Sequence, residues 1–141
     1  MVRVARTASV VRLAISLFLA LVASASVLRA ADTPDQIAER DLARTILKAA
    51  GVKGGLVVHL GCGNGKLTAA LYASESYLVH GLDADPSKVS AARDYIHSRS
   101  LYGKVSVQLW RGDKLPYADN LVRLLVAEDL GRLGMEEVLR V

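Results

Sequence analysis

The chain has 141 residues, of which 18 are Lys or Arg and 14 are Asp or Glu, so its formal net charge is +4. Hydrophobic residues make up 52% of the sequence, which excludes disordered and low-complexity classes, and the length favours one domain. The excess charge belongs to residues 1–31, which hold four arginines and no acid, leaving 14 bases and 14 acids in residues 32–141. A neutral body excludes nucleic-acid binding driven by phosphate neutralisation, so no nucleic-acid partner is expected.

Residues 1–31 contain the three parts of a secretory signal peptide. Three arginines within the first twelve residues form a basic head, the stretch from Leu13 to Leu28 is uncharged, and Ala23-Ser24-Ala25 offers a small-residue cleavage site. We therefore expect a signal peptide at 1–31, a domain at 32–141, and export to the periplasm or outside the cell. The alternative is an uncleaved membrane anchor, which the short uncharged stretch disfavours. Once the leader is cleaved, no stable membrane insertion is expected.

The first elements of the body are an amphipathic helix and a buried strand. Thr33 and Gln36 form a capping-box pattern around Pro34, and apolar residues then recur with helical spacing until Gly51. Leu56–Leu60 is a short, nearly all-apolar run bounded by glycines. Such runs are typical of strands that are buried on both faces of a parallel sheet.

The rest of the body alternates helices with strands. We expect a helix at 67–71, a strand at 77–82, a helix from Asp85-Pro86 to about Ser98, strands at 105–110 and 121–127, and a helix at 135–141. This alternation predicts right-handed crossovers and therefore an α/β fold, a Rossmann-like doubly wound parallel sheet of about four strands.

Gly61-Cys62-Gly63-Asn64-Gly65 follows the first strand directly. In open parallel sheets, ligands bind beyond the carboxyl ends of the strands, where the strand order reverses. Glycines there permit positive φ and a close approach of ligand to backbone, and the next helix begins with free N–H groups. The alternative is a tight connection without a ligand, although a connection alone rarely needs three glycines.

Asp83 ends the second strand, 22 residues after Gly61. A carboxylate at that place can accept hydrogen bonds from both hydroxyls of a ribose, whereas the alternative is a helix cap or a solvated acid. The nicotinamide and flavin fingerprint fails because Lys66 stands where it needs glycine, and the Walker pattern fails because Leu67 follows Lys66. The glycine turn and Asp83 together predict a nucleoside site.

Four stretches resemble the class I S-adenosylmethionine-dependent methyltransferases. Val57–Gly65 looks like the first motif of that family, and Val79–Pro86 looks like the second. Trp110–Asn120 is similar to the family's segment between the third and fourth strands, and Glu136–Val141 resembles the helix before the fifth strand. The resemblance runs from about Ala38 to the last residue, in the family's order, and implies the family's fold.

The resemblance also implies S-adenosylmethionine as cofactor and gives each residue of the site a role. Gly61, Gly63 and Gly65 would line the methionine part, Asp83 would bind ribose, Ala84 would lie along the adenine, and Asp113 would accept from the adenine amine. His59 and Cys62 complete the cofactor-binding set; for Cys62, a packing role is favoured over a nucleophilic one. No metal site is expected.

Two positions depart from the family. His59 stands where most members have an acid that helps hold the amino end of the cofactor. Neutral imidazole can still accept a hydrogen bond but lacks the charge; alternatively, His59 is a polar core residue bonded to backbone. Arg123 replaces a common Asp in the fourth strand, and it could pair with a neighbouring acid.

Length is a further departure, because the family core has seven strands and this sequence reaches about four. A sheet ending there would expose an apolar edge. We therefore expect a domain that is incomplete at its C-terminus, either as a gene fragment or as the front part of a longer product that would continue covalently into further domains.

Two functions follow from the resemblance. The first is methyl transfer to a small-molecule acceptor, with Glu128 and Asp129, just after the fourth strand, or His59 in the first strand as candidate proton acceptors. The second is a catalytically inactive domain that binds a ligand or serves a structural role. His59 and the export signal favour the second function, since S-adenosylmethionine is made inside the cell.

Overall fold

The computed structural model describes residues 32–141, so the predicted signal peptide at 1–31 lies outside the described residues. In the described part, no helix combines the length and apolar character needed to cross a membrane. Its elements are α2 (Pro34–Ala50), β1 (Gly55–Leu60), α3 (Lys66–Leu71), β2 (Tyr77–Asp83), α4 (Pro86–Ser98), β3 (Val105–Leu109), β4 (Val122–Ala127) and α5 (Met135–Arg140). Each expected helix and strand is present, with bounds that differ by a residue or so.

Local signals fix the ends of the helices as the sequence predicts. Thr33 N donates to Gln36 Oε1 (3.0 Å) at the start of α2, and Gly51 ends that helix in the left-handed conformation, with φ of 65°. Asp85 caps α4, since its Oδ1 accepts from Ser87 N at 2.8 Å. Interactions between residues close in sequence therefore determine where these helices begin and end.

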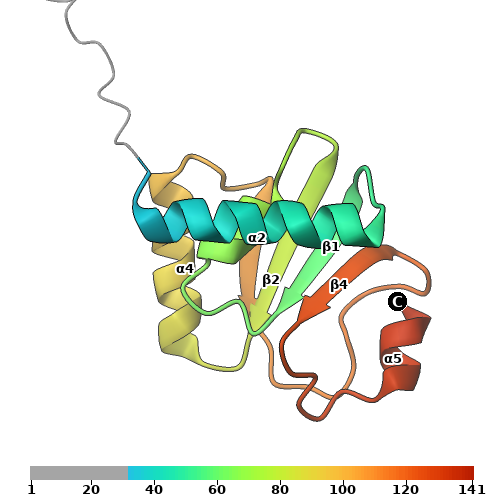
Figure 1. The fold of residues 1–141 in the computed structure, drawn as a ribbon. Coiled ribbons are helices and arrows are strands. Elements are labelled where there is room, and N and C mark those ends of the chain that lie inside the picture. The colour runs from blue at the N-terminus through green and yellow to red at the C-terminus, as the bar shows by residue number, and fades with distance from the viewer. Residues whose placement is uncertain (1–31) are drawn as a thin grey trace, which may run out of the picture. The chain divides into compact units, whose positions relative to one another are not determined.

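The four strands form one parallel sheet in the order β3-β2-β1-β4 (Figure 1). The chain moves outward from β1 through β2 to β3, with α3 and α4 as the crossovers, and then returns to place β4 on the other side of β1. The strand order therefore reverses between β1 and β4, and a ligand site is expected beyond the carboxyl ends of these strands. The α/β fold and the parallel four-stranded sheet are confirmed.

Apolar residues pack on both faces of the sheet. On one face, strand residues meet α2, α3 and α4 through a buried cluster that includes Ala43, Leu47, Leu71, Val89, Ala92 and Ile96. On the other face, Val58, Leu60 and Leu82 pack against Leu115, Leu133 and Val141, which belong to the loops around β4 and to the end of the chain. Three helices thus cover one face, whereas the second face depends on loops and on the short helix α5.

Gly81 shows how tightly the first face is filled next to the glycine turn. It lies opposite His59 in the parallel pairing of β1 and β2. A Cβ at this position would lie 2.9 Å from Cys62 Cβ and 3.1 Å from Thr68 Cγ2. Only a residue without a side chain fits between the strand, the turn and α3.

We expect Gly81→Ala to lower the free energy of unfolding of the full chain by about 1–3 kcal/mol, because the added methyl group overfills a packed core. Urea denaturation followed by circular dichroism measures this. The control is Gly134→Ala, because an added Cβ there meets no atom within 4 Å and the glycine has a φ of −73°. Equal losses for the two variants would contradict the packing argument.

Candidate functional site

A cleft of about 600 Å³ lies where the four strands end. Its lining comes from the carboxyl end of every strand and from the residues that follow: Leu60, Gly61, Leu82, Asp83, Ala84, Lys88, Trp110, Arg111, Gly112, Glu128, Asp129, Leu130, Gly131 and Arg132. The volume lies in the range of small-molecule sites. The cleft is therefore at the place that the reversal of strand order predicts.

The three glycines of the turn have three different surroundings. Gly61, with φ of 71°, lines the cleft, and a Cβ there would meet no atom within 4 Å, so its bare backbone is open to a ligand. The N–H of Gly63 donates to Asp83 Oδ2 at 3.0 Å. Gly65 faces α4 instead, because a Cβ on it would lie 2.9 Å from Ala92 Cα. The structure thus gives Gly65 a helix-packing role outside the cleft lining.

Asp83 is buried at the end of β2 and still lines the cleft. Its Oδ2 accepts from Gly63 N, and its Oδ1 accepts from Asp85 N, both at 3.0 Å. Because each carboxylate oxygen can accept two hydrogen bonds, one acceptor site on each oxygen is left for a ligand. The two backbone contacts hold the carboxylate in a fixed orientation, which favours a ligand with paired hydroxyl groups.

The charges in the cleft are mixed. Asp83, Glu128 and Asp129 supply three acids, while Lys88, Arg111 and Arg132 supply three bases. Arg111 Nε also donates to Ala84 O at 2.8 Å, which ties the end of β3 to the end of β2. A cleft with both signs of charge suits a polar ligand that itself carries both. Sequence reasoning missed the three bases, although each lies a few residues after a strand end.

His59 is buried in β1 and lies outside the cleft lining. Its Nδ1 is 2.8 Å from Thr68 Oγ1 in α3, so the ring has a hydrogen-bond partner within the fold. Burial lowers the pKa of His59, although the charges of Glu128 and Asp83 oppose this effect. The imidazole is therefore neutral at neutral pH and holds α3 against β1. Its polar partner is a side chain rather than the backbone expected for a core histidine.

Cys62 is also buried, and burial raises the pKa of its thiol to about 12. The group therefore stays protonated at neutral pH and is a poor nucleophile. It packs in the cluster between the sheet and the helices, as the packing interpretation expects.

The remaining candidates lie at the rims of the cleft. Glu128 and Asp129 are exposed and line it, and Asp129 Oδ1 accepts from Gly131 N at 2.9 Å. Asp113 is exposed and directly follows the cleft residue Gly112, but does not itself line the cleft. Arg123 forms no ion pair with any residue of 32–141. Within the same residues, no group of three His, Cys, Asp or Glu side chains could hold a metal ion.

Comparison with known proteins identifies the family to which the domain is similar. Residues 57–140 match the family model described as a methyltransferase domain. No curated protein is significantly similar to the chain.

Solved structures share the fold. A methyltransferase from Aquifex aeolicus, described as SAM-dependent, matches with 24% identity and a TM-score of 0.63 over 78% of this chain and 62% of that one. A candidate S-adenosyl-L-methionine-dependent methyltransferase from Methanococcus maripaludis matches with 22% identity and a TM-score of 0.64, over 72% of this chain and 49% of that one. The [4+2]-cyclase SpnF matches with 23% identity and a TM-score of 0.63, over 72% and 40%. The chain thus spans less than two thirds of each.

Burial of two histidines predicts a pH-dependent stability. Burial lowers the pKa of both His59 and His80 below 6.5, so the unfolded chain binds more protons than the folded one at mildly acidic pH. We expect the free energy of unfolding to reach its full value above pH 6.5 and to fall as the pH drops below 6.5, by up to about 1.4 kcal/mol per pH unit for each histidine.

Urea denaturation at each pH measures this dependence. His59→Gln should flatten it, because one of the two buried sites is removed. Three acids have a lowered pKa: Asp32, Asp85 and Glu137. Their protonation lowers the free energy of unfolding only at more acidic pH, so they do not account for the loss that we assign to the histidines. A pH dependence that His59→Gln leaves unaltered would contradict the assignment.

Proposed function

The chain belongs to the methyltransferase-domain family, the class I S-adenosylmethionine-dependent methyltransferases, and on this premise we propose that it transfers a methyl group to a small-molecule acceptor. S-adenosylmethionine is the cofactor to which the family membership points. The proposal concerns this segment alone, since it spans 40% to 62% of the three similar structures.

The observation that carries the proposal is the pairing of buried Asp83 with the open backbone of Gly61 in one cleft. A cofactor with a ribose needs a fixed acceptor of two hydroxyl hydrogen bonds, and the Asp83 carboxylate retains an acceptor site on each oxygen. A cofactor with an amino-acid tail needs close contact with backbone, and a side chain at Gly61 would fill that space. The residues present therefore fit the cofactor.

The other roles follow from position in the cleft. Ala84 and Gly112 line the cleft just after β2 and β3, and we assign this part to the adenine, with Asp113 accepting from its amine. Gly61 and the residues after β4 take the methionine end, where acids and Arg132 can each meet a charge of opposite sign. His59 acts indirectly at this end, through the position of α3.

The bound cofactor supplies an electrophilic methyl group on a sulfonium. This chain contributes mainly by holding the acceptor in line with that group, since orientation provides most of the rate in a displacement of this kind. Glu128 is exposed in the cleft and forms no hydrogen bond within residues 32–141, so it is free to take the proton that the acceptor loses. Asp129 is the second candidate, although Gly131 N already occupies one of its oxygens.

A second function is a domain that binds the nucleoside without transferring a methyl group. The fold also occurs in the [4+2]-cyclase SpnF, and a shared fold does not fix the reaction. The neutral His59 supports this alternative, since the position adds no negative charge next to the glycine turn. Export directed by residues 1–31, which we propose from the sequence, would also favour it. Binding of cofactor without methyl transfer to any acceptor would distinguish this function from the first.

We expect the full chain to bind S-adenosylhomocysteine, the demethylated cofactor, in calorimetric titration. Asp83→Asn should weaken binding at least about tenfold, because it replaces a charged hydrogen-bond acceptor with a neutral amide. Asp94→Asn is the matched control, since Asp94 is an exposed acid of α4 outside the cleft lining. No heat with folded protein would reject the cofactor site, and an unchanged affinity in Asp83→Asn would reject its ribose role.

Asp113→Asn separates adenine recognition from ribose recognition. If Asp113 accepts from the adenine amine, the variant should weaken S-adenosylhomocysteine binding less than Asp83→Asn does, because Asp113 is exposed and water competes for the contact. The same titration with the inosine analogue, whose oxygen replaces the amine, tests the assignment. Asp113→Asn should then reduce the preference for the adenosine compound, and an unaltered preference would remove Asp113 from this role.

A further inference from the structure

The β3–β4 loop, residues 110–121, contains no helix or strand. Its first three residues line the cleft. Two hydrogen bonds fix this wall locally: Trp110 Nε1 donates to Lys114 O at 2.9 Å, and Arg111 Nε donates to Ala84 O at 2.8 Å. The shape of the wall also depends on how the second half of the loop is held, because that half follows directly after it.

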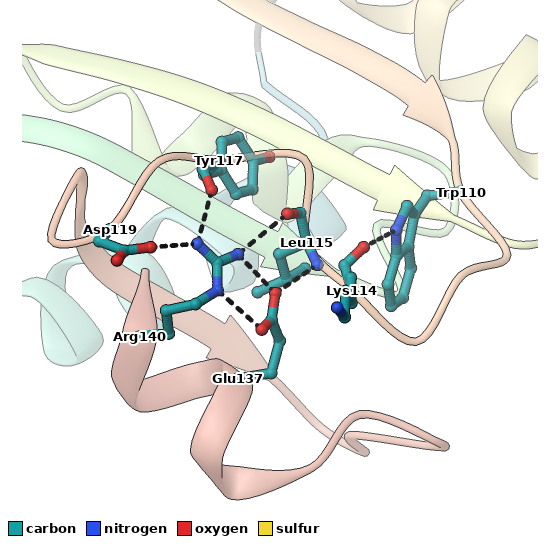
Figure 2. Close-up of polar contacts among 7 residues, drawn as sticks. All are labelled: Trp110, Lys114, Leu115, Tyr117, Asp119, Glu137 and Arg140. Carbon is teal, nitrogen blue, oxygen red and sulfur yellow. Dashed lines mark hydrogen bonds and ion pairs between the residues drawn. The ribbon is translucent and has the colours of Figure 1, made fainter.

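The second half of the loop is held by Glu137 and Arg140 of α5, as Figure 2 shows. The Glu137 carboxylate accepts from Leu115 N at 2.8 Å and from Arg140 Nε and Nη2 at 2.8 and 2.6 Å. Arg140 also donates to the carbonyl oxygens of Leu115 and Tyr117 and to Asp119 Oδ1, at 3.2, 2.9 and 2.6 Å. A planar guanidinium can make all these bonds at once, which an ammonium group cannot do.

This pair is better shielded than a surface ion pair. The side chain of Glu137 is 13% exposed and that of Arg140 is 32% exposed, so screening by water is reduced. The hydrogen bonds from Arg140 and from Leu115 N lower the pKa of Glu137 to about 2. The carboxylate therefore stays ionised at neutral and mildly acidic pH, and the contact does not titrate in that range.

The same helix is joined to the opposite side of the cleft. Glu128–Arg132 contribute residues to that side, and only Leu133 and Gly134 separate them from α5. A helix of six residues is not stable alone, and none of the residues of α5 is fully buried. Its position thus depends on its contacts with the loop, in addition to the buried Leu133 and Val141 that flank it. The hydrogen bonds from Glu137 and Arg140 to the loop, together with the backbone bond from Asn120 N to Arg140 O, consequently connect the two sides of the cleft.

We propose that Glu137 and Arg140 are positioning residues of the cleft, which hold the β3–β4 loop so that Trp110–Gly112 keep the shape that receives the nucleoside. The expected effect of this pair on cofactor affinity rests on the proposed function, whereas its expected effect on the shape of the wall does not. Neither residue lines the cleft. They act through the loop backbone, and loss of the pair should loosen the wall even when no ligand is present.

Trp110 provides the readout, because it is the only tryptophan of the sequence and forms part of the wall. In the full chain, Arg140→Gln should shift Trp110 emission to longer wavelength and increase its quenching by acrylamide, since the indole becomes more exposed. The same variant should weaken S-adenosylhomocysteine binding about tenfold, because the loosened wall must be ordered when the ligand binds. Arg140→Lys keeps the charge but not the fork of donors, so its effects should be smaller.

The control variant must destabilise the protein through a substitution outside the loop. Ala43→Gly meets this need, because Ala43 is buried in the middle of α2 and glycine destabilises helix interiors. Its Trp110 emission and its affinity should equal those of the wild type at temperatures where both are folded. Wild-type values in Arg140→Gln, or equal shifts in Ala43→Gly, would overturn the proposal. If the wild type binds no S-adenosylhomocysteine, the proposed function fails, and the ligand-free fluorescence still decides whether the pair holds the wall.

Discussion

The hydrogen bond from Gly63 N to Asp83 Oδ2 is the contact on which the geometry of the cleft depends. It joins the turn after β1 to the end of β2, and Asp85 N holds the other carboxylate oxygen. The turn can come this close because Gly61 and Gly63 adopt positive φ without steric cost. Asp83 thus stabilises the turn and keeps acceptor capacity for a ligand, so the same carboxylate can serve the fold and the proposed site.

The sequence predicts the elements and this half of the cleft because their determinants are local. Capping residues, apolar periodicity and glycines beside a strand act within a few residues of one another. Gly65 is a residue whose role the local sequence does not predict. The glycine-turn pattern predicts that it lies next to a ligand, whereas in the structure it packs against Ala92, which is distant in sequence. Helix packing decides which of the glycines is open to the cleft, and a turn motif does not show this packing.

The basic residues of the cleft and the contacts that hold the β3–β4 loop could not be predicted from the sequence. Lys88, Arg111 and Arg132 are separated along the chain and have the pattern of solvated charges, yet they gather in one cleft because three strands end there. Glu137 and Arg140 have the spacing of an ordinary helical ion pair. Their partners in the β3–β4 loop are about twenty residues away, and the loop has no periodicity that would reveal them. Long-range polar contacts of this kind need coordinates.

His59 stands where most members of the family have an acid, and its location in the structure shows what this difference changes. The ring lies between β1 and α3, bonded to Thr68, and it is absent from the cleft lining. It therefore adds no base to the cleft, whose lining already contains Glu128 and Asp129. What it changes is the charge next to the glycine turn, where the proposed site would receive the amino end of the cofactor. On this geometry the departure from the family would affect how tightly a cofactor is held in the proposed site, whereas the proposed reaction would depend on the acids that follow β4.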